Sequence, residues 1–245
     1  MKIFDCFVFH DELDLLEIRL SEMSADVDFF VIAEAALTFT GQSKPSHLKD
    51  NWGRFEKWHS QMIHVFVTSF PETRERWTLE KYQRDQLVRG LEKAEEDDIV
   101  LISDVDEIIS AKTLTRIRSA PPAKNEVLCL EQRWFQFFLD NELYEKWLRT
   151  GPRAALRRTM NSPQGMRNVR GPAKGKIWAN ALRGLRSSIA LRRPIKERWL
   201  KMPDGTSHGS EGLRRLTEKR FLLRRTVISP TNWGMPKVRL SMWLR

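Results

Sequence analysis

Apolar runs of strand length alternate with helix-like segments along the first 140 residues of this chain. The runs are rich in Phe, Val and Ile, as is typical of strands that are buried on both faces of a sheet. This order predicts an α/β fold in which a mostly parallel sheet carries helices on its faces. We predict strands over residues 2–9, 28–34, 62–67, 99–103 and 126–130, with helices beginning near residue 12 and over residues 78–96 and 112–118.

The chain is long enough for one large domain, or for one domain with an appendage, and can bury a core of its own. Its 41% hydrophobic content excludes wholesale disorder. Cys6 and Cys129 both lie in predicted strands, so we expect free, buried thiols. No apolar run reaches the roughly 18 residues that a membrane span needs, and no signal peptide is evident, so we expect a cytoplasmic protein.

Charge divides the chain into two unlike parts. Residues 151–245 contain 23 Lys and Arg against four Asp and Glu, a formal charge of +19, whereas residues 1–150 carry −9. The apolar periodicity also fades after about residue 150. We therefore predict a folded domain over residues 1–168, followed by a basic, poorly structured tail over residues 169–245.

An acidic cluster directly follows the apolar run 99–103. Asp104 and Asp106 alternate, so both side chains point the same way if the strand stays extended. Two carboxylates can hold a hard divalent cation whose coordination shell is completed by substrate phosphates. The alternative is a solvated acidic loop, with Glu107 complementing the dipole of the following helix.

A second group of polar residues lies on the predicted helix 78–96. Glu80, Gln83 and Arg84 are spaced by three or four residues and share one helix face. Arg84 could bind phosphate or pair with Asp104 or Asp106; the alternative is a surface ion pair with Glu80. Two more carboxylates, Glu12 and Glu34, stand at the ends of predicted strands, where ligands bind in open α/β sheets.

Five blocks in order resemble the family 17 glycosyltransferases, a family that includes bisecting β-1,4-N-acetylglucosaminyltransferases. The blocks are residues 4–20, residues 30–35 with Thr38-Phe39-x-Gly41, Phe70-Pro71, Trp77-x-x-Glu80-x-x-Gln83-Arg84-Asp85, and residues 102–108. A weaker similarity continues to about residue 168, through Trp147 and the stretch from Ser162 to Asn168. The chain departs from the family at His10-Asp11-Glu12, because relatives usually carry Asn before the Glu.

The resemblance implies a GT-A-like nucleotide-sugar-binding domain. It also implies transfer of a sugar, N-acetylglucosamine in characterised members, from a UDP donor with inversion and with Mn²⁺ or Mg²⁺. The acceptor would be a hydroxyl of a glycan or of a lipid-linked glycan, and no nucleic acid is expected as a partner. The implied metal ligands are Asp104 and Asp106, the implied catalytic residues are Asp106 and the general base Glu107, and the implied donor-binding residues are Glu12, Glu34, Glu80, Gln83, Arg84 and Asp104.

The C-terminal part lacks a block, close to Gly-Gly-Trp-His-Phe-Ser-(Tyr/Trp)-Leu-Gly-Gly, that relatives carry. Regrouping the codons of residues 202–212 (MPDGTSHGSEG), so that each new codon starts at the third base of the old one, permits Ala-Gly-Trp-His-(Phe/Leu)-(Ser/Thr)-Trp-(Leu/Phe)-Gly-Gly. A frameshift between about residues 170 and 202 would thus explain the basic tail. The alternative is a native, Arg-rich segment that contacts the inner face of a membrane near a lipid-linked acceptor.

Two other functional interpretations stay open. A catalytically dead, truncated relative would keep the fold without the reaction. A polyanion-binding or nucleic-acid-binding protein would use the basic tail with its Trp residues, although residues 1–150 are acidic.

Resequencing the gene tests the frameshift. We expect a one-base or two-base insertion or deletion between codons 170 and 202, after which the codons of residues 202–212 give the family block. Codons that do not regroup in this way would rule the frameshift out and leave the tail as native sequence.

Overall fold

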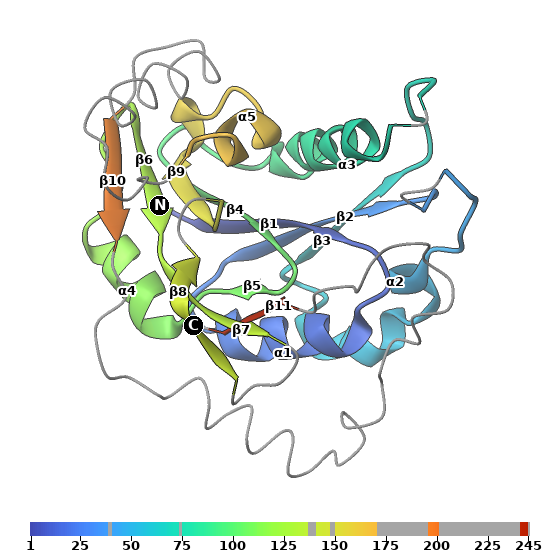
Figure 1. Cartoon of the computed structure of the whole chain (residues 1–245), viewed down its shortest axis with the longest axis horizontal. Coiled ribbons are helices and arrows are strands. Elements are labelled where there is room, and N and C mark those ends of the chain that lie inside the picture. Colours follow the sequence, from blue (N-terminus) through green and yellow to red (C-terminus); the bar gives the residue numbers. More distant parts are fainter. Residues whose placement is uncertain are drawn as a thin grey trace.

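A seven-stranded sheet forms the centre of the molecule (Figure 1), with the strand order β10-β6-β9-β4-β1-β2-β3. The computed structural model describes residues 1–38, 41–73, 75–136, 141–147, 150–170, 196–200 and 241–244. All neighbours in this sheet are parallel except β9, which is antiparallel to β4 and β6. The strands are β1 (Ile3–Phe9), β2 (Phe29–Ala35), β3 (Met62–Val67), β4 (Ile99–Asp104), β6 (Glu126–Leu130), β9 (Arg153–Leu156) and β10 (Lys196–Leu200).

Helices cover both faces of the sheet, with α1 on one face and α3 and α5 on the other (Figure 1). Alternation along β1 divides the core between these faces, because Ile3 and Phe7 pack with Leu16 of α1, whereas Phe4 and Cys6 pack with the residues under α3. The helical segments are α1 (Leu13–Met23), α2 (His47–Asp50), α3 (Arg76–Asp85), α4 (Ala111–Ser119), α5 (Pro163–Arg167) and the 3₁₀ segments η1 (Trp52–Trp58), η2 (Gln86–Leu91) and η3 (Arg157–Thr159).

The strand order reverses between β1 and β4. From β1 the chain adds β2 and β3 on one side and then returns to place β4 on the other side of β1. In open α/β sheets the crevice beyond the carboxyl ends of two such strands binds ligands. Here those ends are Phe9, just before Glu12, and Asp104, so the fold places the acidic cluster at the switch point.

The predicted helix 78–96 divides into two parts. It is α-helical as α3 and then tightens into the 3₁₀ segment η2, which ends at Leu91. Gly90 explains the close approach of η2 to the sheet: a Cβ at Gly90 would lie 2.3 Å from Cγ1 of Val31 and 3.3 Å from side-chain carbons of Ile63 and Val65. The pattern of apolar residues marked the helix, but not this contact.

A smaller four-stranded sheet, in the order β5-β11-β7-β8, lies beside the end of β4. Its strands are β5 (Glu107–Ile108), β7 (Gln132–Gln136), β8 (Glu142–Trp147) and β11 (Ser241–Leu244). Trp134 of β7 and Trp147 of β8 form an edge-on aromatic pair with ring centroids 5.2 Å apart. The sheet therefore brings Trp147 to the turn that follows Asp104.

The predicted α/β fold with a mostly parallel sheet is confirmed. Cys6 and Cys129 are free and buried, as predicted. Most of the predicted tail, namely residues 171–195, 201–240 and 245, lies outside the described residues, and its described parts include the strands β10 and β11. The boundary at residue 168 and the frameshift stay predictions. Across the described ranges, no helix has both the length and the apolar character that a membrane span needs.

Candidate active site

Asp104, the last residue of β4, is held by two arginines from the layer above the sheet. Nη2 of Arg84 lies 2.9 Å from Oδ1, and Nη2 of Arg167 lies 2.7 Å from Oδ2. Burial raises the pKa of Asp104, but Arg167 and then Arg84 outweigh burial and hold the pKa below its usual range. Asp104 is therefore ionised at neutral pH, and both of its oxygens accept charge-assisted hydrogen bonds.

Glu107 is fully buried beneath the same arginine. Its carboxylate accepts hydrogen bonds from Nη1 and Nη2 of Arg167, at 2.7 and 2.8 Å, and from Nε1 of Trp147, at 2.6 Å. A fourth hydrogen bond, of 2.9 Å, comes from the backbone N–H of Asp104. A carboxylate offers about four lone-pair sites, so the capacity of Glu107 is used. This geometry does not favour the predicted role of Glu107 as a general base.

Asp106 is in a different electrostatic environment. Among the described residues, its half-buried carboxylate makes no hydrogen bond or ion pair. Burial raises the pKa of Asp106 well above its usual range, and three nearby carboxylates, those of Asp104, Glu107 and Glu12, raise it further. The charge of Arg167 acts in the opposite direction. The ionised form of Asp106 is thus disfavoured unless a cation approaches its carboxylate.

The site as a whole carries an excess of negative charge. Two guanidinium groups, those of Arg84 and Arg167, face the carboxylates of Glu80, Asp104, Asp106 and Glu107. With every carboxylate ionised, these six groups carry a formal charge of −2, and the nearby carboxylate of Glu12 makes the site more negative. Within the described ranges, no three His, Cys, Asp or Glu side chains gather into a complete metal site. The residues fit a hard cation that takes one or two carboxylates from the protein and its other ligands from a substrate, the pattern of Mg²⁺ with phosphates.

A buried arginine, Arg19 of α1, holds the turn 104–107 from below. Its guanidinium forms an ion pair with Asp5 of β1 through hydrogen bonds of 2.8 and 2.6 Å, and both side chains are fully buried. Arg19 also donates to Oγ of Ser103 at 2.5 Å. Three further hydrogen bonds, of 2.9, 3.1 and 3.2 Å, go to the backbone carbonyls of Asp104, Val105 and Glu107.

The predicted group on α3, Glu80, Gln83 and Arg84, does not act as one unit, because its side chains make different contacts. Gln83 faces the sheet and donates to the carbonyls of Phe9, at 3.3 Å, and Ala33, at 2.8 Å. Arg84 faces the site and, besides Asp104, pairs with Glu80 at 2.7 Å. The predicted contact between Arg84 and Asp104 is therefore present, and the surface-pair alternative describes only part of its environment.

Arg84 and Asp85 also connect α3 to α5. Nη1 of Arg84 donates to Oε1 of Gln164 at 2.7 Å, and Oδ1 of Asp85 accepts a hydrogen bond of 2.8 Å from the backbone N–H of Gln164. The two helices thereby hold the two arginines of the site, Arg84 and Arg167, side by side above β4.

The remaining predicted carboxylates lie in two places. Glu12 accepts hydrogen bonds from the backbone N–H groups of His10 and Asp11 and lies near enough to Asp106 to raise its pKa. It thus belongs to the cluster at the switch point and shapes the turn that leads from β1 into α1.

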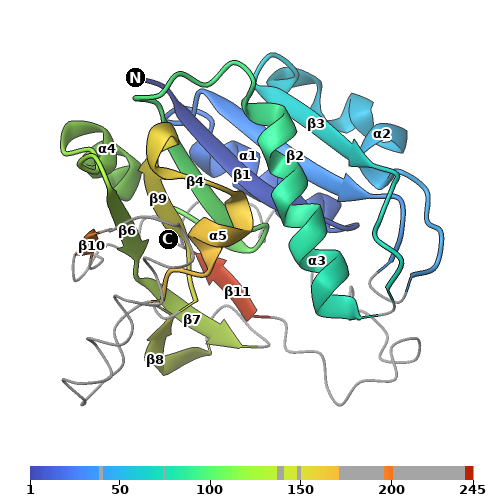
Figure 2. The same cartoon turned by 90° about the horizontal axis from the view of Figure 1, so that it is seen from above.

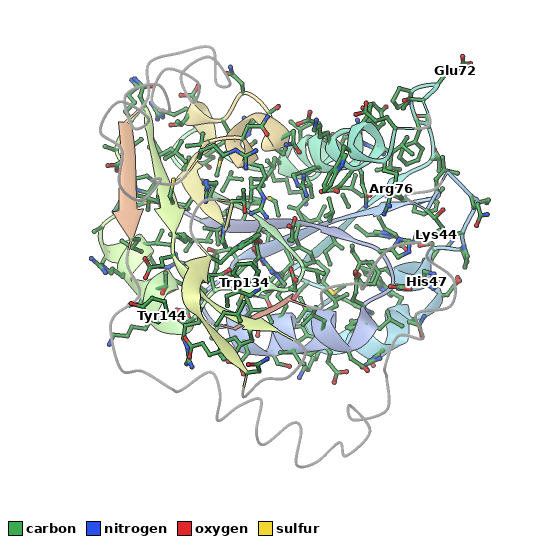
Figure 3. All side chains as sticks on the ribbon, viewed as in Figure 1. Lys44, His47, Glu72, Arg76, Trp134 and Tyr144 are labelled. Carbon is green, nitrogen blue, oxygen red and sulfur yellow. The ribbon has the colours of Figure 1, made fainter. Side chains whose placement is uncertain are left out.

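Glu34, near the end of β2, is fully buried and belongs to a different cluster. Its carboxylate contacts Nζ of Lys44 at 3.1 Å, Oγ of Ser46 at 2.7 Å and Nε2 of His64 at 3.0 Å. Burial raises its pKa, but the hydrogen bonds from His64 and Ser46 and the charge of Lys44 together lower the pKa to about 2. In Figure 3, Lys44 lies at the same end of the molecule as His47 and Arg76. These contacts anchor the segment after β2, and they do not place Glu34 in the acidic cluster.

Three residues that build the site were not predicted from the sequence. Arg19 lies in the first block that resembles the family, but nothing in its sequence context shows that its partners at the end of β4 and in the turn after it are 84 to 88 positions away. Trp147 and Arg167 lie in the weaker similarity that extends to residue 168. That weak signal was the only indication that residues beyond 110 contact the acidic cluster.

Arg167 is predicted to be essential for stability. Removing it by Arg167→Ala leaves Asp104 and the buried Glu107 without their shared cation, so unfolding should become easier by about 3–5 kcal/mol. Arg118→Ala is the control, because Arg118 makes a half-exposed ion pair with Asp28 and should change stability by less than about 1 kcal/mol. Urea unfolding monitored by circular dichroism measures both; equal effects would contradict the assigned network.

Glu34 should make stability depend on pH in the acidic range. Because its pKa in the folded state is about 2, against 4.5 for an unperturbed Glu, the stabilisation is fully present above about pH 4.5 and is lost as the pH falls toward 2. The difference in unfolding free energy between the natural protein and Glu34→Gln should therefore shrink across that range. The matched control Glu56→Gln, at an exposed position, should show no such trend. A constant difference for Glu34→Gln would contradict the lowered pKa.

Comparison with known proteins connects this site to a family. The family model described as glycosyltransferase family 17 matches residues 1–203. The β-1,4-mannosyl-glycoprotein 4-β-N-acetylglucosaminyltransferases of Rattus norvegicus and Homo sapiens are each 28% identical over 156 residues, which cover 58% of this chain. The chain covers only 27% of the length of these relatives.

Solved structures with a similar fold include two nucleotidyltransferase-type enzymes. The 4-diphosphocytidyl-2C-methyl-D-erythritol synthase of Anaerococcus prevotii is 13% identical with a TM-score of 0.44, covering 91% of this chain and 99% of the other. A nucleotidyl transferase of Methanothermobacter thermautotrophicus is 15% identical with a TM-score of 0.40, covering 87% and 95%. The family assignment rests on the family model, which spans most of the chain: this protein belongs to glycosyltransferase family 17.

Proposed function

We propose that this protein transfers N-acetylglucosamine from UDP-N-acetylglucosamine to a hydroxyl of a glycan or of a lipid-linked glycan, with Mn²⁺ or Mg²⁺ and with inversion. Family membership supports sugar transfer in general. The observation that carries the proposal is the cluster of Asp104, Asp106 and Glu107 with Arg84 and Arg167 at the switch point of the sheet. An activated sugar of this class carries a diphosphate, and the cluster offers both the cations and the carboxylates that such a group requires.

The charge of the site supports metal dependence. A diphosphate would not enter a site with a formal charge of −2 unless a divalent cation compensates the carboxylates. Asp106 is the best-placed ligand, because its carboxylate is half-buried, surrounded by negative charge and not bonded to either arginine. Asp104, the second predicted ligand, would have to break its ion pair with Arg84 or with Arg167 before it could bind the metal. When bound, the cation would stabilise the negative charge of the leaving diphosphate.

The two arginines would then bind the phosphates, and Glu107 would hold Arg167 in place. Arg84 and Arg167 present planar guanidinium groups at one carboxylate, and the same geometry suits phosphate oxygens. Glu107 orients Arg167 through two hydrogen bonds and holds the backbone N–H of Asp104 through a third. We therefore propose Glu107 as a positioning residue.

Inverting transfer is a single displacement. The acceptor oxygen forms a bond to the anomeric carbon as the bond from that carbon to the diphosphate oxygen breaks, the acceptor's hydroxyl proton passes to a base, and UDP and the glycosylated acceptor are the products. The chain's part in this step is to fix the diphosphate against α3 and α5 while the acceptor approaches the opposite side of the anomeric carbon.

Hydrolysis of UDP-N-acetylglucosamine in the presence of MnCl₂ tests this proposal without knowledge of the acceptor. We expect the natural protein to release UDP, and Asp106→Ala to lower the rate by roughly a hundredfold or more, since a direct metal ligand is removed. Asp97→Ala, at an exposed carboxylate that pairs with Arg158, is the matched control and should keep the natural rate. Equal rates for Asp106→Ala and the natural protein would contradict the assignment. A natural protein with no activity would support the catalytically dead relative instead.

A further inference from the structure

The first turn of α3 extends beyond the carboxyl ends of the strands (Figure 2). Gln83 marks the level of the sheet edge, because it donates to the carbonyl of Phe9, the last residue of β1, and to that of Ala33 near the end of β2. Farther along the chain, Gly90 packs against Val31 near the start of β2. The helix therefore runs from the carboxyl edge toward the amino edge, and its first turn extends past the ends of the strands, as Figure 2 shows.

Trp77 stands on the first turn of α3, on the same side of the helix as Arg84. It precedes Arg84 by seven residues, which places the two side chains within about 20° of each other around the helix and about 10 Å apart along it. Arg84 reaches Asp104 of β4 and Gln164 of α5, so this side of α3 faces the switch point. The side that packs on the sheet carries Leu79 and Gln83, which are almost fully buried.

The exposure of Trp77 is unusual for a side chain of its size. It is 65% exposed, whereas Leu79, two positions later, is 5% exposed. An indole placed in water above a charged site gains nothing from the core, yet it offers a broad, flat surface for a planar ring. The helix fixes the distance between the indole and Arg84, and therefore the distance between the indole and a phosphate bound at Arg84 and Arg167.

We infer that Trp77 is the surface on which the nucleobase of the donor stacks, an inference that rests on the proposed function. If the diphosphate binds at Arg84 and Arg167, the sugar extends from one side of it and the nucleoside from the other. α3 lies above the carboxyl ends of β1 and β2 through Gln83, so a nucleoside directed along this helix passes beneath Trp77. The other side of the diphosphate, toward Trp147 and the smaller sheet, is left for the sugar and the acceptor.

Stacking on an indole depends on the flat face of a base more than on its identity. The contact would therefore strengthen nucleotide binding without selecting uracil over cytosine. It would also have no effect on a ligand that contains the diphosphate alone.

Calorimetric titration of UDP and of inorganic pyrophosphate, each with MnCl₂, tests the inference. Trp77→Ala should weaken UDP binding by about tenfold or more and pyrophosphate binding by less than about twofold. Trp77→Phe should keep most of the affinity for UDP, because a flat ring remains. Val88→Ala is the control, since Val88 is a 40% exposed apolar residue on η2, which lies over the sheet and away from the projecting start of α3. This variant should bind both ligands as the natural protein does.

Three results would overturn the inference. UDP affinity that is unchanged in Trp77→Ala, including the case in which only transfer to an acceptor falls, would show that the indole does not contact the base. An equal loss for UDP and pyrophosphate would show that the substitution disturbs the phosphate site. A natural protein that binds neither ligand would refute the proposed function, whereas normal binding by the natural protein with no effect of Trp77→Ala would refute the stacking alone.

Discussion

The site depends on a fully buried ion pair. Arg19 and Asp5 are both fully buried, and the guanidinium uses its remaining donors on Ser103 and on three carbonyls of the turn that follows β4. Two charges removed from water are costly unless they are paired and hydrogen-bonded. Arg19 and Asp5 pair through two hydrogen bonds, and Arg19 makes four more. The turn is thereby fixed before any ligand arrives, which is the condition for carboxylates to face a cation in one defined geometry.

A second arginine closes the same turn from above. Arg167 joins Asp104 to Glu107, and Trp147 completes the shell of Glu107 from the smaller sheet. The cluster therefore requires the part of the chain after residue 140 as much as the strands of the first hundred residues. Within the turn 104–107, the carboxylate of Asp106 is the one that these contacts leave without an ion pair, and it is there that we propose a cation binds.

Much of the fold was predictable because its signals are local. The strands 62–67 and 126–130 match β3 and β6, and the apolar run before Asp104 correctly placed the acidic cluster at a strand end. β9 was missed because its four residues begin with Arg153, whose buried guanidinium donates to three backbone carbonyls that no sequence window shows. The same limit applies to the site: the partners of Arg19 and Arg167 lie 60 or more positions away for every contact with the turn, so their roles depend on the sheet topology.

The central claim is that Asp106 and a substrate diphosphate share one divalent cation. Anomalous diffraction at the manganese edge, from a crystal containing Mn²⁺ and UDP, tests it most directly. We expect one peak within bonding distance of the Asp106 carboxylate and of both phosphates, with Arg84 and Arg167 near the phosphate oxygens. A peak elsewhere in the molecule, or bound UDP with no peak beside Asp106, would contradict it.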